Sequence, residues 1–549
     1  MKNPLTINQK SDKSANIVNP YIYRYNGKYY MFTTKIKTKS EMHCYVSDDL
    51  LNWSNPKVVF RCDNQVIYCT SICYNDGLFY MIGQNKDGGH VMLQAKNILG
   101  QYRINNDNVD QNEGGTLYKN SLFAFRYFRS NDKGFSLSDM DINAKISNRK
   151  DILQEMNVKM IDPDIIYRDC KYYLTYKDAN TNSINYIFSD DLDKHYQVNN
   201  YHQLLKLEDD SYRNIGSHNM VLAPDLDGYY MCYSLVKEIK DKKGNVKKEE
   251  SSLCLDRVRF NGTILSSRLS LFEKDNPKLP DVYADFEKGS KGFRKINDKY
   301  LSVDPTGEIF TAEFNQKGKM NVIVSYYDDA NYILIKGFKN TIVINNIFQG
   351  KNHIIVKKDL PINFKYHHTL RVICSEFKAE YLIDDVSIAV TSKLPAGKIG
   401  YVSQDKKGIG YTAFSNASLG SSDLNMNNII PGMLDCLHDL KKKETNLDKY
   451  DDVYFSSVYE KEVISFKTLS DKKEDYYHLS VLINPNYSTS LRVTSLLEEK
   501  VFEIDAISCE YPYYLKDLGY IKIAKEDEIK IRVNKGVLVY KAFDIRNKD

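Results

Sequence analysis

Aromatic and β-branched residues alternate with polar residues through the first half of the chain, in a phrase that recurs five times. Each copy joins a tight polar turn to an aromatic strand, as in "NGKYYMF", and most copies follow a short apolar strand. Period-two alternation on both sides of a short turn predicts a β-hairpin. The five hairpin phrases span residues 26–32, 75–83, 119–128, 168–176 and 226–234.

A second phrase follows several of these hairpins after about fifteen residues. Its clearest copies are "YVSDDLLNW" at residues 45–53 and "YIFSDDLDKHY" at residues 186–196. The Ser-Asp-Asp-Leu ending favours a turn because an aspartate side chain accepts backbone N–H bonds. Five units of about four strands, repeating every 40 to 57 residues or so, predict a five-bladed β-propeller.

The aromatic repeat stops at a proline-punctuated linker, residues 274–281. Beyond it, short alternating strands recur roughly every 10 to 12 residues, which predicts an antiparallel β-sandwich. A second linker and a further β-rich stretch complete the chain. The predicted fold class is therefore all-β, a five-bladed β-propeller followed by two β-sandwich modules. We place the domains at residues 1–273, 281–420 and 433–549.

The charge balance narrows the expected partners. The net charge is +4, from 76 basic and 72 acidic residues, so no field favours a polyanion, and nucleic acid is not an expected partner. No segment reaches about 18 uninterrupted apolar residues, so no membrane association is expected. The N-terminal residues lack the apolar core of a signal peptide, which favours a cytoplasmic location unless a signal has been removed.

Cofactor motifs are missing from the sequence. There is no GxGxxG, P-loop or HExxH pattern, and the ten cysteines are scattered without a CxxC pair. We therefore expect no cofactor and no metal site, and the cysteines are expected to be free thiols.

The ordered set of blade phrases resembles glycoside hydrolase family 43 over about residues 16–268. The phrases that carry the likeness are "NPYIYRYNGKYYMF", "SDDLLNW", "MIDPDIIYRDCKYYLTY" and "GSHNMVLAPDLDGYYMCYS". The strands that follow, ending in "KIGYVSQDKKGIGYTAFSNAS", look like the lectin-like sandwich often appended to these enzymes. This resemblance implies that the protein hydrolyses an oligosaccharide of the arabinose, xylose or a related type in the funnel of the propeller.

Hydrolysis of a glycosidic bond generally needs two carboxyl groups. The resemblance implies a base Asp in the first blade, and that position holds Asn19, whose neutral amide cannot accept a proton but can bond a sugar hydroxyl. Asp162, in the intact Ile-Asp-Pro phrase, matches the family's second Asp. Glu113, in "NEGG", is the candidate acid. Asp164 shares a strand face with Asp162 and is a further candidate carboxylate.

Other residues are candidates for binding the sugar. His218 resembles a last-blade His that reaches the funnel axis and contacts an ion or water beneath the sugar. Arg126 is placed to reach a substrate hydroxyl or carboxylate, and Tyr21 to stack on a sugar ring. Each has a purely structural alternative, because His, Arg and Tyr in hairpins also serve packing and hydrogen bonding.

Three functions remain open on the sequence alone. The first is glycoside hydrolysis through paired carboxylates. The second is glycan binding without catalysis, in which Asn19 marks abandoned chemistry. The third is glycosyl transfer or phosphorolysis, which predicts a cluster of Arg, Lys and His in the funnel. Fold does not decide among them, because function resides in the site.

Overall fold

The computed structural model describes most of the chain. The described residues are 1, 3–5, 17–36, 40–62, 66–85, 87–111, 114–131, 133–154, 158–193, 196–197, 203–207, 212–240, 246–261, 264–267, 276–375, 378–416, 436–437, 447–450, 453–468, 474–483, 487–506, 514–524 and 527–547. The chain divides into two compact units. The first comprises residues 1–197, 209–255 and 270–421, and the second comprises 198–208, 256–269 and 422–549.

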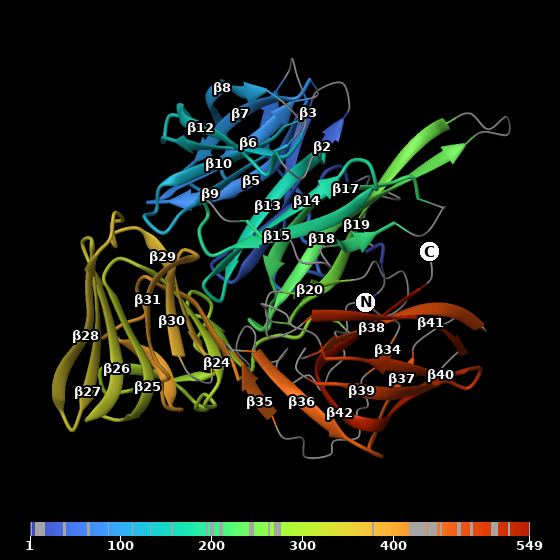
Figure 1. The fold of residues 1–549 in the computed structure, drawn as a ribbon. Coiled ribbons are helices and arrows are strands. Elements are labelled where there is room, and N and C mark those ends of the chain that lie inside the picture. The colour runs from blue at the N-terminus through green and yellow to red at the C-terminus, as the bar shows by residue number, and fades with distance from the viewer. Residues whose placement is uncertain are drawn as a thin grey trace. The chain divides into compact units, whose positions relative to one another are not determined.

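Five four-stranded antiparallel sheets form the first half of the chain, which confirms the predicted propeller (Figure 1). In every sheet the strands follow one another in chain order. The first sheet contains β1 (Tyr21–Tyr25), β2 (Lys28–Ile36), β3 (Ser40–Ser47) and β4 (Lys57–Cys62), and the second β5 (Ile67–Asn75), β6 (Leu78–Asn85), β7 (Gly89–Ala95) and β8 (Arg103–Gln111). The third contains β9 (Gly115–Lys119), β10 (Phe125–Ser130), β11 (Phe135–Met140) and β12 (Ile146–Ile152). The fourth contains β13 (Met160–Arg168), β14 (Lys171–Asp178), β15 (Ser183–Ser189) and β16 (Gln203–Lys206), and the fifth β17 (Asn214–Leu222), β18 (Tyr229–Lys240), β19 (Val246–Asn261) and β20 (Ile264–Ser266).

The first strands of the five sheets form a closed ring. Each of β1, β5, β9 and β13 lies beside the first strand of the following sheet, and β17 lies beside β1. Radial repetition of this kind leaves only short strand edges exposed. Aromatic side chains fill the space between neighbouring sheets, as the fully buried Tyr29 and Tyr127 do. The ring therefore directs the beginnings of five separate strands toward one axis.

A β-sandwich follows the propeller within the first unit. Its six-stranded sheet has the order β21 (Val282–Asp285), β33 (Ile409–Ser415), β24 (Phe310–Lys317), β29 (His367–Cys374), β30 (Lys378–Ile383) and β31 (Val386–Ser392). Its seven-stranded sheet has the order β22 (Phe293–Ile296), β23 (Lys299–Ser302), β32 (Lys398–Val402), β25 (Met320–Asp328), β26 (Asn331–Phe338), β27 (Thr341–Phe348) and β28 (Lys351–Asp359). Side chains from both sheets, among them Phe314, Ile335 and Tyr401, share one apolar core.

The C-terminal strands form a module of nine antiparallel strands with its own core. They are β34 (Cys436–Leu437), β35 (Leu447–Tyr450), β36 (Val453–Tyr459), β37 (Val463–Thr468), β38 (Glu474–Ile483), β39 (Thr489–Thr494), β40 (Glu499–Ile504), β41 (Tyr514–Ala524) and β42 (Glu528–Asn547). The long strand β42 pairs with β36, β37, β38 and β39. The all-β class is thus confirmed, whereas the boundaries 1–273, 281–420 and 433–549 stay predictions. None of the described residues belongs to a helix long and apolar enough to cross a membrane.

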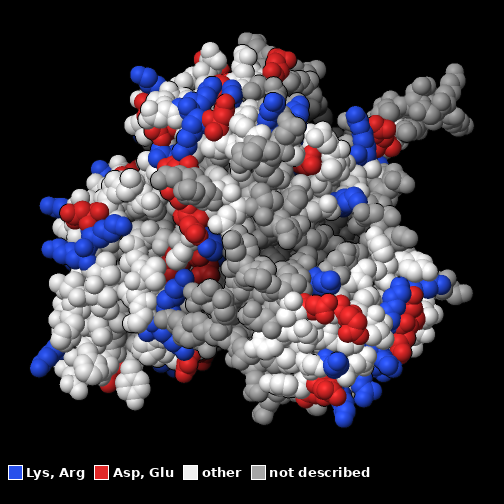
Figure 2. All heavy atoms as spheres, in the orientation of Figure 1, with Lys and Arg blue, Asp and Glu red and all other residues white. Residues whose placement is uncertain are grey.

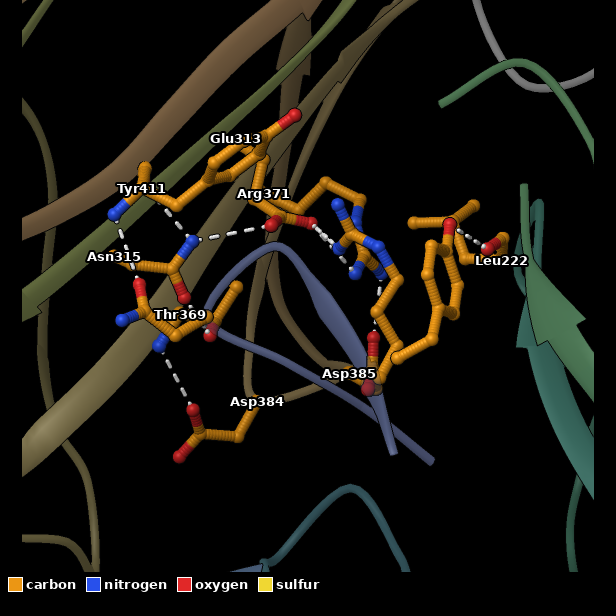
Figure 3. A network of polar contacts seen from close by, with 11 residues as sticks. Leu222, Glu313, Asn315, Thr369, Arg371, Asp384, Asp385 and Tyr411 are labelled. Carbon is orange, nitrogen blue, oxygen red and sulfur yellow. Dashed lines mark hydrogen bonds and ion pairs between the residues drawn. The ribbon is translucent and has the colours of Figure 1, made fainter. Parts of the chain in front are cut away.

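A buried polar network joins the sandwich to the first blade (Figure 3). The carboxylate of Glu313, on β24, is fully buried and pairs with Arg24 of β1 and with Arg371 of β29, the latter at 3.2 Å. Asn315 donates to the other Glu313 oxygen at 3.1 Å. Burial alone would raise the pKa of Glu313, but the two guanidinium charges outweigh it and hold that pKa below its usual value.

The turn between β30 and β31 reaches toward the propeller from the same sheet. Asp385 accepts a hydrogen bond from Arg371 at 2.5 Å, and Asp384 accepts one from the backbone N–H of Thr369 at 2.9 Å. Lys119, at the end of β9, lies 3.9 Å from Asp384. The contact with Lys119 places the carboxylate of Asp384 against the far end of the inner propeller strand β9.

Candidate functional site

A cavity of about 770 Å³ lies where the inner strands of the propeller begin. Its wall includes Asn19 just before β1, Tyr68 in β5, Asp162 in β13 and Ser217 in β17, each within the first four residues of its strand or directly ahead of it. We call this hollow the mouth cavity. Its other lining residues are Gln84, Asn85, Asp87, Gly88, Gln111, Ser130, Asn131, Lys159, Ile161, Lys177, Asn214 and Gly216.

The mouth cavity brings together two of the predicted site residues from phrases 143 positions apart. Both Asn19 and Asp162 precede a proline and adopt left-handed backbone conformations, with φ values of 46° and 51°. Asn and Asp tolerate this region better than other non-glycine residues, because their short polar side chains bond locally. The ladder of β13 shifts register between Ile161 and Asp164, so a bulge turns Asp162 out of regular pairing.

Gly114 allows the third blade to pack closely against the backbone of Asp162. It has a φ of 77°, and a Cβ at this position would lie 2.6 Å from the backbone nitrogen of Asp162. Only glycine allows so close an approach without displacing one strand. Its N–H donates to Gln84 at 3.1 Å, which ties the second blade to the same point. Glu113, the predicted acid, lies outside the described residues.

The lining offers many hydrogen-bonding groups and few charges. Amides, hydroxyls and two lysines dominate it, and the described carboxylates in the wall are Asp87 and Asp162. Lys177 donates to Asn214 and to the carbonyl of Ile215, both at 2.5 Å. The described wall has neither arginine nor histidine, so the cationic cluster expected for phosphorolysis is represented there by lysines alone.

His218 is not among the described lining residues of the mouth cavity. Its ring is buried, and Nε2 is 3.1 Å from the hydroxyl of Thr175 on β14. Burial, reinforced by the nearby positive charge of Lys177, lowers the pKa of His218 to about 3, so the ring is neutral at physiological pH. In this position His218 supports the bulged strand β17 and is not part of the described lining.

A second, smaller hollow of about 130 Å³ lies further along the same inner strands. Tyr21 and Asp164, each two residues beyond a mouth residue, line this axial cavity, and at its other end Asp384 and Asp385 of the sandwich form part of the wall. Tyr21 is therefore one layer below the mouth. Burial, and next the charge of Asp164, raise the pKa of its hydroxyl.

Asp164 is a buried carboxyl group whose pKa is raised. Its carboxylate accepts the backbone N–H of Met220 at 2.8 Å. Desolvation nevertheless dominates and raises the pKa of Asp164 to about 7. Its place in the axial cavity separates it from Asp162, although both belong to β13.

Replacing Asp164 by Asn should change how stability depends on pH. Because the folded pKa of Asp164 lies above the ordinary value of 3.8, the native protein binds the proton more tightly than the unfolded chain, and its stability falls as the pH rises from 4 to 7. Asn removes this pH-dependent contribution to stability, and its side-chain oxygen can still accept the backbone N–H of Met220. The free energy of unfolding of Asp164→Asn relative to wild type should rise by up to about 1.4 kcal/mol per pH unit across this window.

Fluorescence of Trp53, the one tryptophan of the chain, reports unfolding of the propeller because its ring is buried in the first blade. Urea titrations at pH 4, 5, 6, 7 and 8 give the free energies. A difference between the two proteins that stays constant across this range would show that Asp164 does not titrate with a raised pKa.

Arg126 lies away from both hollows. It belongs to β10, the second strand of its sheet, and pairs with Asp139 of β11 and with Asp193, the latter at 3.1 Å. The structure thus brings Asn19 and Asp162 together and places Tyr21, Asp164, His218 and Arg126 elsewhere. No group of three or more His, Cys, Asp and Glu within the described ranges is arranged to hold a metal ion.

Several residues of the wall were not predicted from the sequence. Gln84 and Asn85 end β6, Lys159 precedes β13, and Lys177 lies near the end of β14. Each of these residues stands at the same end of a blade hairpin as Asn19 and Asp162. This position in the hairpin is a signal by which the sequence could have identified them.

A match to a family model agrees with the sequence resemblance. Residues 13–264 match the family model described as Glycosyl hydrolases family 43. Similar solved structures include a GH43 protein from Bacillus licheniformis, with 14% identity and a TM-score of 0.40, covering 72% of this chain and 96% of that one. A xylan beta-1,4-xylosidase from Bacillus halodurans C-125 has 13% identity and a TM-score of 0.39, covering 76% and 100%. A GH43 beta-1,3-galactosidase has 12% identity and a TM-score of 0.40, covering 75% and 93%. No curated protein matches.

Proposed function

Because residues 13–264 match the glycosyl hydrolases family 43 model, we propose that the mouth cavity binds an oligosaccharide and that the protein hydrolyses a glycosidic bond there. The observation that carries this proposal is the meeting of Asn19 and Asp162, from the two family-like phrases, in one polar hollow. Its volume of about 770 Å³ lies within the range of roughly 300–1,000 Å³ typical of small-molecule sites.

Asp162 and Glu113 are the carboxyl groups that we propose for the chemistry. One carboxyl group protonates the departing glycosidic oxygen, while the other activates water or attacks the anomeric carbon. Asn19 serves as a hydrogen-bonding partner for a sugar hydroxyl, because its amide has both donors and an acceptor. The remaining amides and hydroxyls of the wall orient the sugar. Lys159 and Lys177 add donors, so a neutral or weakly acidic glycan suits the cavity.

Glycan binding without hydrolysis is the second candidate, and Asn19 is the observation that favours it. An amide cannot take a proton from water, so a site that uses this position as its base would bind sugar and leave the bond intact. The two candidates predict the same cavity and differ only in turnover.

Product release from a panel of saccharides tests the proposal. Purified protein is incubated with aryl xylosides, arabinofuranosides and galactosides and with the corresponding oligosaccharides, and products are separated by chromatography. Hydrolysis of at least one compound by the wild type is expected. Binding by calorimetry without any release would favour the second candidate, and neither binding nor release would contradict both.

The variant Asn19→Asp should raise turnover at least tenfold, because it adds a further proton acceptor at the position where the family resemblance expects the base, and general acid–base groups typically contribute 10²- to 10⁴-fold. The left-handed backbone at this position suits Asp as well as Asn, so folding should be preserved. Asn131→Asp, which adds the same charge elsewhere in the wall, is the matched control. An equal gain in both variants would show that added charge, and not the position, is responsible.

A further inference from the structure

A third hollow, which we call the seam groove, lies where the first blade meets the sandwich. It has a volume of about 660 Å³. The start of β2 and the turn after β3 contribute Lys28 and Asp48, while the sandwich contributes Tyr283, Asp285, Gly289 and Tyr411. None of these residues lines the mouth cavity, so the seam groove is a separate feature of the same unit.

An aromatic surface forms one side of the seam groove. Tyr283, on the edge strand β21, is 45% exposed, and its ring centroid is 6.4 Å from that of Tyr411 with the planes inclined by 28°. Such an exposed ring offers an apolar face to a ligand and keeps its hydroxyl available to water. A sugar ring carries C–H groups on one face, which suits contact with an aromatic face.

Tyr411 is firmly held under this surface. Its backbone N–H donates to the side chain of Asn26 at 2.8 Å, and the guanidinium of Arg24 lies 5.9 Å from its ring centre. Its ring also packs on Gly27, where an added Cβ would come within 2.1 Å of it. The aromatic surface is therefore pre-organised, which reduces the entropic cost of binding.

Charged side chains of both signs, with an excess of aspartates, line the groove around the aromatic surface. Lys28 lies 2.8 Å from Asp48 and 4.0 Å from Asp285, and Lys288 lies 3.5 Å from Asp285. The side chains of Asp48 and Lys288 remain 72% and 67% exposed. Carboxylates accept hydrogen bonds from sugar hydroxyls, and lysines donate to them. With five aspartates against three lysines in the lining, an anionic glycan is disfavoured.

We propose that the seam groove is a second saccharide site, which binds a short neutral oligosaccharide through stacking on Tyr283 and hydrogen bonds to Lys28, Asp48 and Asp285. The site goes beyond the function proposed for the mouth cavity and needs no hydrolysis. A protein that holds a polymer at the seam groove raises the local concentration of that glycan near its mouth cavity.

Affinity electrophoresis tests the proposal with the full chain. Native gels are cast with xylan, arabinan or β-1,3-galactan, and one with polygalacturonate as the acidic comparison. Two variants remove the site by opposite means. Tyr283→Ala deletes the stacking surface, and Gly289→Trp fills the groove at a position where an added Cβ meets no atom within 4 Å. Both should weaken retardation by a neutral glycan at least tenfold in apparent affinity.

Two controls separate this site from the mouth cavity and from general effects. Tyr327→Ala removes an 81% exposed tyrosine of the same sandwich and should leave retardation unchanged. Ser217→Trp narrows the mouth cavity and should abolish any hydrolysis while retardation persists. Thermal unfolding confirms that each variant is folded.

Unchanged retardation in both seam variants, or loss in Ser217→Trp alone, would assign binding to the mouth cavity and overturn the proposal. The absence of retardation of the wild type in all three neutral gels, or stronger retardation by polygalacturonate, would overturn it as well. Each result is independent of whether the wild type releases product.

Discussion

Asp162→Asn should lower kcat/KM for the hydrolysed saccharide by about 10²- to 10⁴-fold, the range typical of an acid–base group. The change removes the ionisable group and keeps the shape of the side chain. Asn also tolerates the left-handed backbone that Asp162 adopts next to Gly114, so the wall of the mouth cavity should stay intact. Binding of the saccharide, measured by calorimetry, should change far less than turnover.

Asp87→Asn is the matched control for this experiment. Asp87 is the other described carboxylate of the wall and lies on an exposed turn between β6 and β7. Its neutralisation should alter kcat/KM by no more than a few fold. A loss below tenfold in Asp162→Asn, or equal losses in both variants, would exclude Asp162 from the chemistry and direct attention to other groups.

Glu313→Gln should reduce the free energy of unfolding of the first unit by about 3–5 kcal/mol. The carboxylate is fully buried between Arg24 and Arg371, and its neutralisation leaves two guanidinium groups without that compensating charge. Gln retains hydrogen-bonding atoms of the same size, so the loss reports charge and not packing. Urea unfolding followed by Trp53 fluorescence and by far-ultraviolet circular dichroism gives the value.

The exposed pair between Glu308 and Lys393 of the same sandwich supplies the comparison. Its atoms lie 2.8 Å apart, yet Glu308 is 78% exposed, and water screens such pairs. Glu308→Gln should leave the unfolding midpoint almost unchanged. If Glu313→Gln behaved in the same way, the buried network would not stabilise the contact between propeller and sandwich.

Local patterns predicted the fold well because each blade is built from short hairpins. Turn residues such as Asn26-Gly27 and Asp76-Gly77 occupy positive φ values, as two-residue turns require, and their flanking strands pair as the alternation indicated. The mixture of acidic and basic side chains on the face shown in Figure 2 also agrees with the small net charge, since neither sign gathers into one large patch there.

The site was harder to predict because a sequence does not show how far along the propeller axis each residue lies. Tyr21 and Asp164 each follow a mouth residue, Asn19 and Asp162, by two positions, yet two residues of extended chain correspond to about 7 Å, which moves them from the mouth cavity to the axial cavity. Arg126 belongs to the second strand of its sheet and not to the inner one. Lys159 and Gln84 enter the wall only because the ring closes, which depends on contacts between distant blades.

The Asp384–Asp385 turn has a consequence for the kind of glycan that the proposed site would accept. The turn belongs to the wall of the axial cavity, whose volume of about 130 Å³ is far smaller than the 770 Å³ of the mouth cavity. With sandwich side chains at that end of the inner strands, a saccharide bound as proposed would approach from the mouth side. Under the proposed function, chain termini and short side branches therefore suit this geometry better than the middle of a continuous backbone.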